Sequence, residues 1–158
     1  MELYFVRHAA AAPRGDWEGD DSQRPLTDGG RQDMARMAGL LARLAPAVDA
    51  IVTSPYLRAS ETADIVSQHL DLQDKVVVDE RLEPGFDAGR LGKVVKGFPE
   101  AKALVLVGHE PDFSSTIGEL TGGRVVMKKG GIACVETADA SLKRAVLAWL
   151  VQPGVIGA

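Results

Sequence analysis

The stretch Leu3-Tyr4-Phe5-Val6-Arg7-His8 places an arginine and a histidine directly after a short apolar run. An apolar run of this length, bounded by polar residues, is typical of a buried strand. Two later segments follow the same design. Residues 50–53 lead into Ser54-Pro55-Tyr56-Leu57-Arg58, and residues 103–107 lead into Gly108-His109. The sequence therefore predicts three buried strands, each followed at once by polar, chemically active side chains.

Helical patterns lie between these strands. Thr27 is a good N-cap, with Asp28 in the first turn. Apolar residues then recur at helical spacing from Met34 to Leu44, and Pro46 ends the pattern. These signals predict a helix over about 28–45.

A second helix is predicted after the second strand. Ser54 is its expected N-cap and Pro55 its first helical residue, a position that proline favours. Its apolar stripe runs from Ala59 to Leu70. Three shorter elements follow: a buried strand at 76–78, a short helix around 91–98, and a helix that starts near Pro111 and ends at Gly122-Gly123.

The end of the chain has a different pattern. Residues 132–136 and 145–151 are expected to be strands joined by a turn near 139–141, which is an antiparallel hairpin. The preceding alternation of strands and helices is typical of an α/β protein. We therefore predict one domain over residues 1–158. It is a three-layer sandwich with a mainly parallel central sheet, helices on both faces and an antiparallel C-terminal hairpin.

Composition narrows the class of protein. The 158 residues include 18 basic and 22 acidic side chains, for a net charge of −4, which argues against a nucleic-acid partner. No apolar run approaches the ~20 residues that a membrane span needs, so no membrane association is expected. The start of the chain does not resemble a signal peptide. Cys134 is the only cysteine and is expected to be a small core residue. A cytoplasmic location is predicted.

The polar residues after the strands should meet. In an open α/β sheet, ligands bind in the crevice beyond the carboxyl ends of the strands. Arg7, His8, Arg58 and His109 would then share one crevice in an acidic protein, which points to an anionic ligand such as a phosphoryl group. Each alone has an ordinary structural explanation, as a strand-end histidine or a solvated arginine. A zinc site is disfavoured because the arginines would repel a cation, so no metal and no cofactor are predicted.

The longest irregular segment is about 9–26, directly after the first strand. It is rich in glycine, proline and acidic residues, and a long loop in such a place is usually functional or mobile. The acidic residues lack the ligand order of a calcium loop. Trp17 either flanks the crevice or packs the loop down. His69, late in the second predicted helix, is expected at the surface without a role.

Taken together, the motifs resemble the histidine phosphatase superfamily, with its phosphoglycerate-mutase-like fold, and most closely its small SixA-type phosphohistidine phosphatase branch. The resemblance spans about 2–120. It rests on Val6-Arg7-His8-Ala9, Arg24-Pro25-Leu26-Thr27 with Gly30, Ser54-Pro55-Tyr56-Leu57-Arg58-Ala59 with Glu61-Thr62, and Val107-Gly108-His109-Glu110-Pro111.

This resemblance implies roles for the four crevice residues. His8 would be the nucleophile that accepts the phosphoryl group, Arg7 and Arg58 would bind phosphate oxygens, and His109 would complete the binding site. Guanidinium groups suit this task because they are planar, permanently charged and bidentate. Two positions depart from the family pattern. Ala9 replaces the usual glycine, and Pro84 stands where larger members place an acid, so that Glu83 and Asp87 are the nearest candidate general acids.

The departures also suggest a substrate. An N–P bond to imidazole is labile and depends less on a positioned acid than an alkyl ester does. The segment 79–99 is too short for a large lid, so an open pocket is expected. The predicted partner is therefore phosphohistidine on a protein, such as a phosphotransfer domain. A phosphatase for a small phosphorylated metabolite ester and a non-catalytic phosphate-binding module stay open as alternatives.

Overall fold

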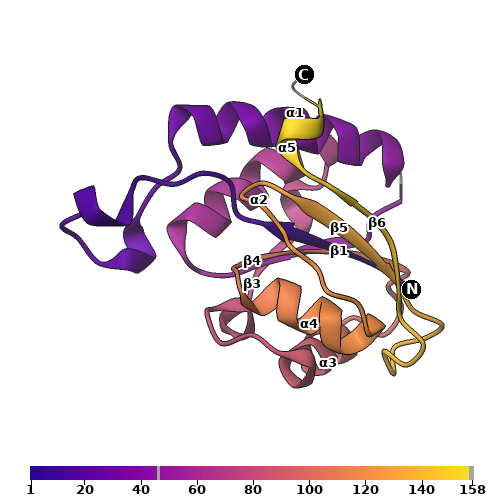
Figure 1. Ribbon diagram of the computed structural model, residues 1–158. Helices are drawn as coiled ribbons and strands as arrows, with labels where there is room; N and C mark the ends of the chain where they lie inside the picture. The colour runs from indigo at the N-terminus through magenta and orange to yellow at the C-terminus, as the bar shows by residue number, and fades with distance from the viewer. Residues whose placement is uncertain (46, 157–158) are drawn as a thin grey trace.

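A six-stranded sheet in the order β3-β2-β4-β1-β5-β6 forms the centre of the computed structural model, which describes residues 1–45 and 47–156 (Figure 1). Strands β1 to β4 are parallel to one another, whereas β5 is antiparallel to β1 and β6 is antiparallel to β5. The mainly parallel sheet and the C-terminal hairpin are thus confirmed. The strands are β1 (Glu2–Arg7), β2 (Ala50–Thr53), β3 (Val76–Val78), β4 (Ala103–Gly108), β5 (Ile132–Glu136) and β6 (Val146–Val151).

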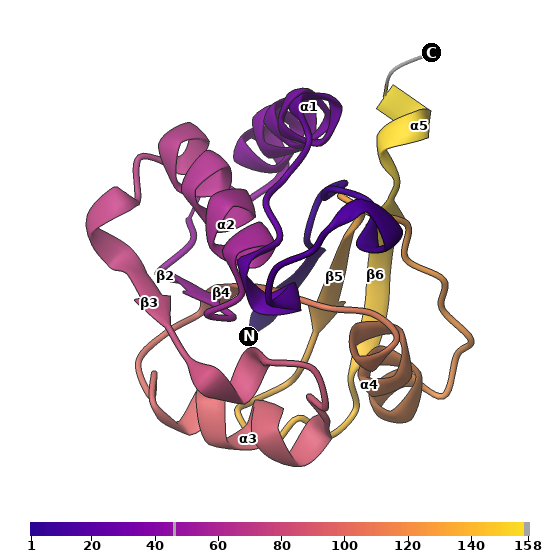
Figure 2. The same cartoon turned by 90° about the vertical axis from the view of Figure 1, so that its left-hand side faces the viewer.

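Helices cover both faces of the sheet, as predicted. Figure 2 shows α1, α2 and α5 on one side of the strands and α3 and α4 on the other. Two separate clusters of buried apolar residues fill the two interfaces. The helices are α1 (Asp28–Leu44), α2 (Leu57–Leu70), α3 (Ala88–Lys96), α4 (Asp112–Thr121) and α5 (Pro153–Ile156).

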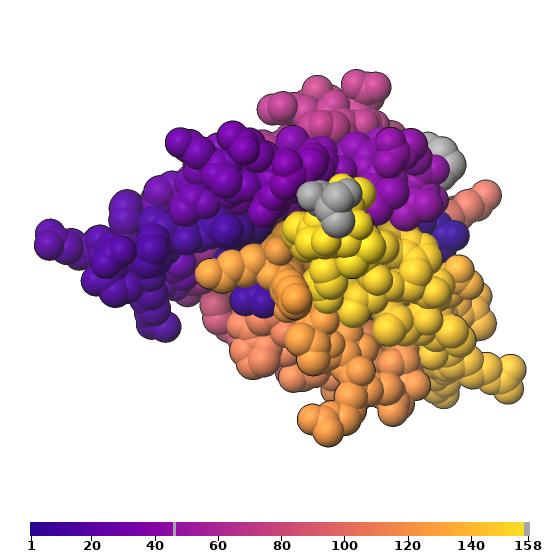
Figure 3. All heavy atoms as spheres, turned by 45° about the horizontal axis from the view of Figure 1, so that its top comes forward, coloured from indigo at the N-terminus to yellow at the C-terminus, as the bar shows by residue number. Residues whose placement is uncertain are grey.

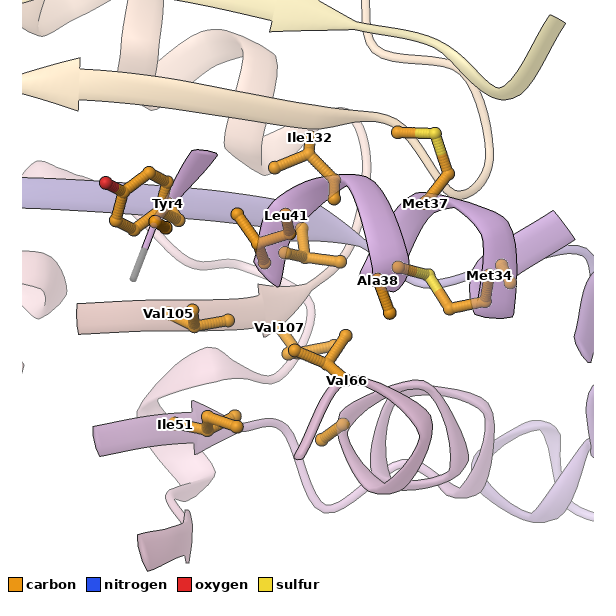
Figure 4. Packing of buried hydrophobic residues seen from close by; sticks show 14 of the residues in the cluster. Tyr4, Met34, Met37, Ala38, Leu41, Ile51, Val66, Val105, Val107 and Ile132 are labelled. Atoms are coloured by element: carbon orange, nitrogen blue, oxygen red, sulfur yellow. The ribbon is translucent and has the colours of Figure 1, made fainter. Parts of the chain in front are cut away.

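The apolar stripe of α1 explains how this helix docks. Met34, Met37, Ala38 and Leu41 are fully buried. Figure 4 shows these side chains directed at residues from several strands and at Val66 of α2. Burying an aliphatic side chain of this size contributes about 1.5–3 kcal/mol. Because the strands beneath are covered on both faces, they are continuously apolar, and all six residues of β4 are buried.

Of the two predicted helix starts, the first is confirmed and the second is wrong. Thr27 caps α1 by accepting a hydrogen bond from the Gly30 N–H at 3.0 Å, as expected. The prediction for α2 was wrong, since this helix begins at Leu57 and Ser54 is not its cap. The Ser54 hydroxyl is shared between the Tyr56 N–H and His109, so that residues 54–56 form a turn before the helix. The predicted stop at Pro46 lies outside the described residues.

The prediction that 76–78 is buried was also wrong. Strand β3 pairs only with β2 and forms an edge of the sheet. Val77 is 41% and Val78 60% exposed. A run of three valines has the same pattern at an edge as in a core, so the sequence alone does not separate the two cases. Within the part of the chain that the structure describes, no helix has both the length and the apolar character of a membrane span.

Candidate active site

Three strand ends place the candidate residues beside one another. Arg7 at the end of β1 is in register with Gly108 at the end of β4, and Thr53 of β2 is in register with Val107. The next residues continue this alignment, because the His8 N–H donates to the Gly108 carbonyl at 3.0 Å. A pocket of about 550 Å³ opens here. Its lining includes all four predicted residues, Arg7, His8, Arg58 and His109.

The hydrogen bonds of His8 define its reactive nitrogen. Its Nδ1 lies 2.8 Å from the Ala9 carbonyl oxygen, which can only accept, so Nδ1 carries the proton. Nε2 therefore holds the lone pair, and Arg58 Nε donates to it at 3.3 Å. The Ala9 peptide is held in turn, because its N–H donates to the Thr62 hydroxyl. The ring is thus oriented with Nε2 as the nucleophilic atom.

The charge state of His8 also suits a nucleophile. Burial, assisted by the neighbouring His109, Arg58 and Arg7, lowers the pKa of His8 to about 3. The imidazole is therefore neutral at physiological pH. A protonated Nε2 would have no lone pair with which to attack phosphorus.

His109, the second histidine in the lining of the pocket, lies close to His8. The centroids of the His8 and His109 rings are 5.4 Å apart. His109 Nε2 lies 2.8 Å from the Ser54 hydroxyl, whereas its buried Nδ1 has no hydrogen-bond partner among the described residues. Burial, followed by the charge of Arg58, lowers the pKa of His109 to about 4. When the Ser54 hydroxyl donates to Nε2, the proton of the neutral ring is on Nδ1.

Arg7 keeps part of its guanidinium free. Nη1 donates to the Met127 carbonyl at 2.7 Å, while the buried Nε has no partner among the described residues. A buried N–H without a partner costs free energy, which an anion in the pocket would recover. Arg7 is thus prepared to bind an oxyanion.

Arg58 is engaged by the segment that follows β1. Its Nη1 donates to the Asp21 backbone carbonyl at 2.7 Å, and its Nη2 donates to the Asp21 carboxylate at 3.1 Å. The guanidinium carbon lies 4.9 Å from the centre of the Tyr56 ring. This role of Asp21 could not be predicted from the sequence, because Asp21 is one of several acids in an irregular segment and no spacing distinguishes it. A phosphate oxygen that binds Arg58 must share this guanidinium with Asp21 or displace its carboxylate.

The segment 9–26 is ordered by local contacts. It contains short 3₁₀ turns at Arg14–Asp16 and Asp21–Gln23. Its far end is fixed by Glu61, which accepts from the Leu26 N–H at 2.7 Å. The Trp17 indole N–H donates to the Asp20 carbonyl, and Trp17 is not among the lining residues of the pocket. Of the two predicted roles for Trp17, packing within the loop is the one observed.

Neither predicted acid lines the pocket. Asp87 caps α3 by accepting from the Arg90 N–H, and Glu83 lines a separate hollow beside Arg81. Pro84, between them, does line the pocket. The carboxylates that line it are Asp21 and Glu110, which the sequence analysis did not single out for this role. Both oxygens of Glu110 accept hydrogen bonds from Ser114, through its N–H and its hydroxyl.

The pocket has a basic rim. Arg14, Arg24 and Lys129 join Arg7 and Arg58 in its lining, although the whole chain carries a net charge of −4. The Arg14 side chain is 84% exposed. Figure 3 shows orange atoms of the segment between α4 and β5 next to indigo atoms from near the start of the chain. Among the described residues, no three His, Cys, Asp or Glu side chains are grouped as metal ligands.

Two residues outside the pocket behave as predicted. Cys134 is buried, and burial raises the pKa of its thiol to about 12. His69 is exposed on α2, where its Nδ1 contacts the Ile65 carbonyl one turn earlier.

The two depressed pKa values predict how stability depends on pH. In the unfolded chain both pocket histidines have a pKa near 6.5, whereas in the folded protein they titrate at about 3 and about 4. Between these values only the unfolded chain binds the protons. Stability is therefore highest above pH 6.5 and falls as the pH decreases, by up to ~1.4 kcal/mol per pH unit for each histidine.

Urea unfolding at about pH 7.5 and about pH 5 measures this effect. We expect His8→Asn to lose less stability than the wild type over this range, by ~1 kcal/mol or more. His69→Asn is the matched control, because this histidine is exposed. Equal losses in the wild type and in His8→Asn would show that His8 is not held neutral by the fold.

Comparison with known proteins shows the family of this chain. An α/β sheet with two arginines and two histidines gathered near adjoining strand ends is suited to bind an anion such as a phosphoryl group. The family model of the histidine phosphatase superfamily (branch 1) matches residues 3–90. The chain belongs to this superfamily, and the resemblance inferred from its motifs is confirmed.

Individual known proteins are also similar to this chain. The phosphohistidine phosphatase SixA of Escherichia coli is 31% identical over 125 residues, which are 78% of this chain and 76% of that protein. A solved structure of the protein histidine phosphatase SixA complexed with tungstate has a TM-score of 0.87 at 26% identity, covering 98% of this chain and 99% of that one. The mycobacterial glucosyl-3-phosphoglycerate phosphatase shares the fold, with a TM-score of 0.71 at 18% identity and coverage of 93% and 96%.

Proposed function

We propose that this protein is a phosphatase that works through a phosphohistidine intermediate on His8 and acts on phosphohistidine in a protein. The observation that carries the proposal is the state of His8. It is a neutral imidazole in the lining of the pocket, its Nε2 lone pair accepts from Arg58 Nε, and the half-buried Arg7 lines the same pocket. Membership of the histidine phosphatase superfamily supports a phosphatase activity. Phosphohistidine in a protein, as the substrate, is a more specific proposal than a phosphatase activity.

In the first step, the Arg58 Nε–H releases His8 Nε2 and turns to a phosphoryl oxygen, and Nε2 attacks phosphorus with the freed lone pair. An N–P bond forms to His8, and the bond from phosphorus to the leaving group breaks with its electron pair. Arg7 and Arg58 neutralise charge on the equatorial oxygens, which is the main demand of phosphoryl transfer. The Ala9 carbonyl stabilises the positive charge that develops on the His8 ring by accepting from Nδ1–H. His109 donates to a phosphoryl oxygen.

In the second step, water attacks the phosphorus of phospho-His8. The N–P bond breaks, its electron pair returns to Nε2, and inorganic phosphate leaves. The proton lost by the water passes to the phosphate. His8 returns to its neutral form with the proton on Nδ1, ready for another cycle.

Three features favour a phosphoramidate on a protein. Glu83 and Asp87 lie outside the pocket, and the two carboxylates that line it are engaged, Asp21 by Arg58 and Glu110 by Ser114. A ring nitrogen leaves more easily than an alkoxide without a positioned proton donor. The exposed cations Arg14 and Lys129 at the rim suit a large anionic partner that cannot enter fully. SixA, the solved relative with tungstate bound, is described as a protein histidine phosphatase, and tungstate is a phosphate-like oxyanion.

A substrate panel tests this proposal. We expect kcat/KM for a phosphohistidine-bearing phosphotransfer domain to exceed that for sugar and glycolytic phosphate esters by ~10-fold or more, because ester cleavage gains ~10²–10⁴-fold from a positioned acid. Glu83→Gln and Asp87→Asn should reduce N–P cleavage only modestly. Since Glu83 and Asp87 lie outside the pocket, these variants also serve as controls for the fold.

The opposite ranking would change the substrate class. A small ester preferred by ~10-fold or more, with a large loss on Glu83→Gln, would identify a metabolite phosphatase with a displaced general acid. Tight phosphate binding without turnover of any substrate would instead identify a phosphate-binding module.

A further inference from the structure

The side chain of Gln152 spans a segment of backbone beside the pocket. Gln152 follows β6 and precedes α5, far along the chain from the catalytic candidates. Its Nε2 donates to the Val126 carbonyl at 2.8 Å, and its Oε1 accepts from the Lys128 N–H at 2.8 Å. These two bonds flank Met127, whose carbonyl accepts from Arg7 Nη1 at 2.7 Å.

The bond to Lys128 acts on the same peptide group that Arg7 uses. The Met127 carbonyl and the Lys128 N–H belong to one peptide unit, which is planar and trans, so the two groups point in opposite directions. Fixing the N–H on Gln152 therefore fixes the direction of the carbonyl toward Arg7. An amide whose N–H is hydrogen-bonded is also polarised, which makes its carbonyl a better acceptor.

The surrounding backbone is shaped to admit this side chain. A Cβ atom on Gly131 would lie 2.5 Å from Gln152 Oε1 and 2.9 Å from the Lys128 carbonyl oxygen, so any larger residue would displace the amide. The same turn is joined to the site, because the Arg7 N–H donates to the Gly131 carbonyl and the Gly130 N–H donates to the His8 carbonyl. Gln152 therefore braces a turn that contacts both Arg7 and His8.

We propose that Gln152 is a positioning residue that holds the Arg7 guanidinium in its phosphate-binding orientation through the Met127–Lys128 peptide. This inference rests on the proposed function, in which Arg7 binds phosphate. Gln152 does not itself line the pocket. Without it, the Met127–Lys128 peptide can rotate and Arg7 loses the one acceptor that it has among the described residues. The guanidinium then samples orientations that do not meet the phosphoryl oxygens.

Steady-state kinetics with p-nitrophenyl phosphate, and with inorganic phosphate as inhibitor, test the proposal. We expect Gln152→Ala to lower kcat/KM and to weaken phosphate inhibition by about 5- to 10-fold. Gln152→Glu keeps the acceptor for Lys128 but loses the donor to Val126, so it should retain more activity than the alanine variant. Gln68→Ala, at an exposed position on α2, is the matched control.

A double-mutant cycle with Arg7→Lys gives the decisive readout. If Gln152 acts through Arg7, then Gln152→Ala should cost less than about 2-fold in the Arg7→Lys background. The same 5- to 10-fold loss in both backgrounds would overturn the proposal, as would an unchanged kcat/KM in Gln152→Ala. If Gln152→Ala fails to fold, the Gln152→Glu cycle decides by the same criterion. An Arg7→Lys variant with normal kinetics would instead refute the phosphate-binding role of Arg7 itself.

Discussion

Replacing His8 with asparagine is expected to lower kcat/KM by at least ~10³-fold, because the variant has no atom in the place of Nε2. Asparagine is the informative choice. Its amide is short enough to occupy the position of Nδ1 and can still donate to the Ala9 carbonyl, so the loop contact of the wild type has a replacement. The loss would then report the missing nucleophile and not a collapsed turn.

The intermediate itself can be trapped. Brief incubation with a labelled phosphodonor and a rapid quench should leave label on His8 that is labile to acid and stable to base. The His8→Asn variant should carry none, and His69→Asn, altered at an exposed histidine, should be labelled like the wild type. Full activity in His8→Asn would show that phosphoryl transfer does not pass through this residue.

The positions of the catalytic candidates could be predicted because they depend on the sheet alone. Arg7, His8 and His109 follow buried apolar runs, and parallel strands bring their carboxyl ends to one edge whatever the loops do. Arg58 follows for a related reason, since it lies in the first turn of the helix after β2. The error in the predicted start of this helix, at Ser54 instead of Leu57, did not affect the predicted place of Arg58, because Arg58 remains at the same end of α2.

Contacts made by irregular segments could not be predicted in this way. Asp21 reaches Arg58 through a 3₁₀ turn whose position depends on many local hydrogen bonds, and nothing in the sequence separates it from the neighbouring acids. Gln152 likewise acts across the hairpin on a segment without regular structure. Hydrophobic periodicity carries no information about such side-chain-to-backbone bonds.

The candidate acids show how short turns limit the same reasoning. Glu83, Pro84 and Asp87 lie within a few residues of one another, so proximity in sequence made all of them plausible. The chain after β3 forms a 3₁₀ turn at Glu80–Leu82 and then enters α3. This path presents Pro84 to the pocket, commits Asp87 to capping α3 and leaves Glu83 outside the lining. A shift of one residue along the chain therefore decides whether Glu83 or Pro84 lines the pocket.

Replacing Arg58 with lysine is expected to lower kcat/KM by ~10²-fold or more, although the charge is kept. Arg58 uses all three nitrogens at once: Nε contacts His8 Nε2, and both Nη atoms contact Asp21. A single ammonium cannot reproduce this fork, so the lysine variant loses either the contact with the nucleophile or the contact with Asp21. Arg36→Lys is the matched control, since Arg36 pairs with Asp33 at the surface of α1.

Inhibition by oxyanions, measured together with kcat/KM, should distinguish phosphate binding by the two arginines from a purely structural role. Arg7 and Arg58 contact the phosphoryl group in the proposed mechanism, so the corresponding alanine variants should weaken inhibition by tungstate or phosphate along with kcat/KM. Near-normal kinetics in both Arg7→Ala and Arg58→Ala would refute the clamp. A loss of stability without a change in oxyanion binding would assign Arg58 to holding the 9–26 segment through Asp21, because that is the other contact its guanidinium makes.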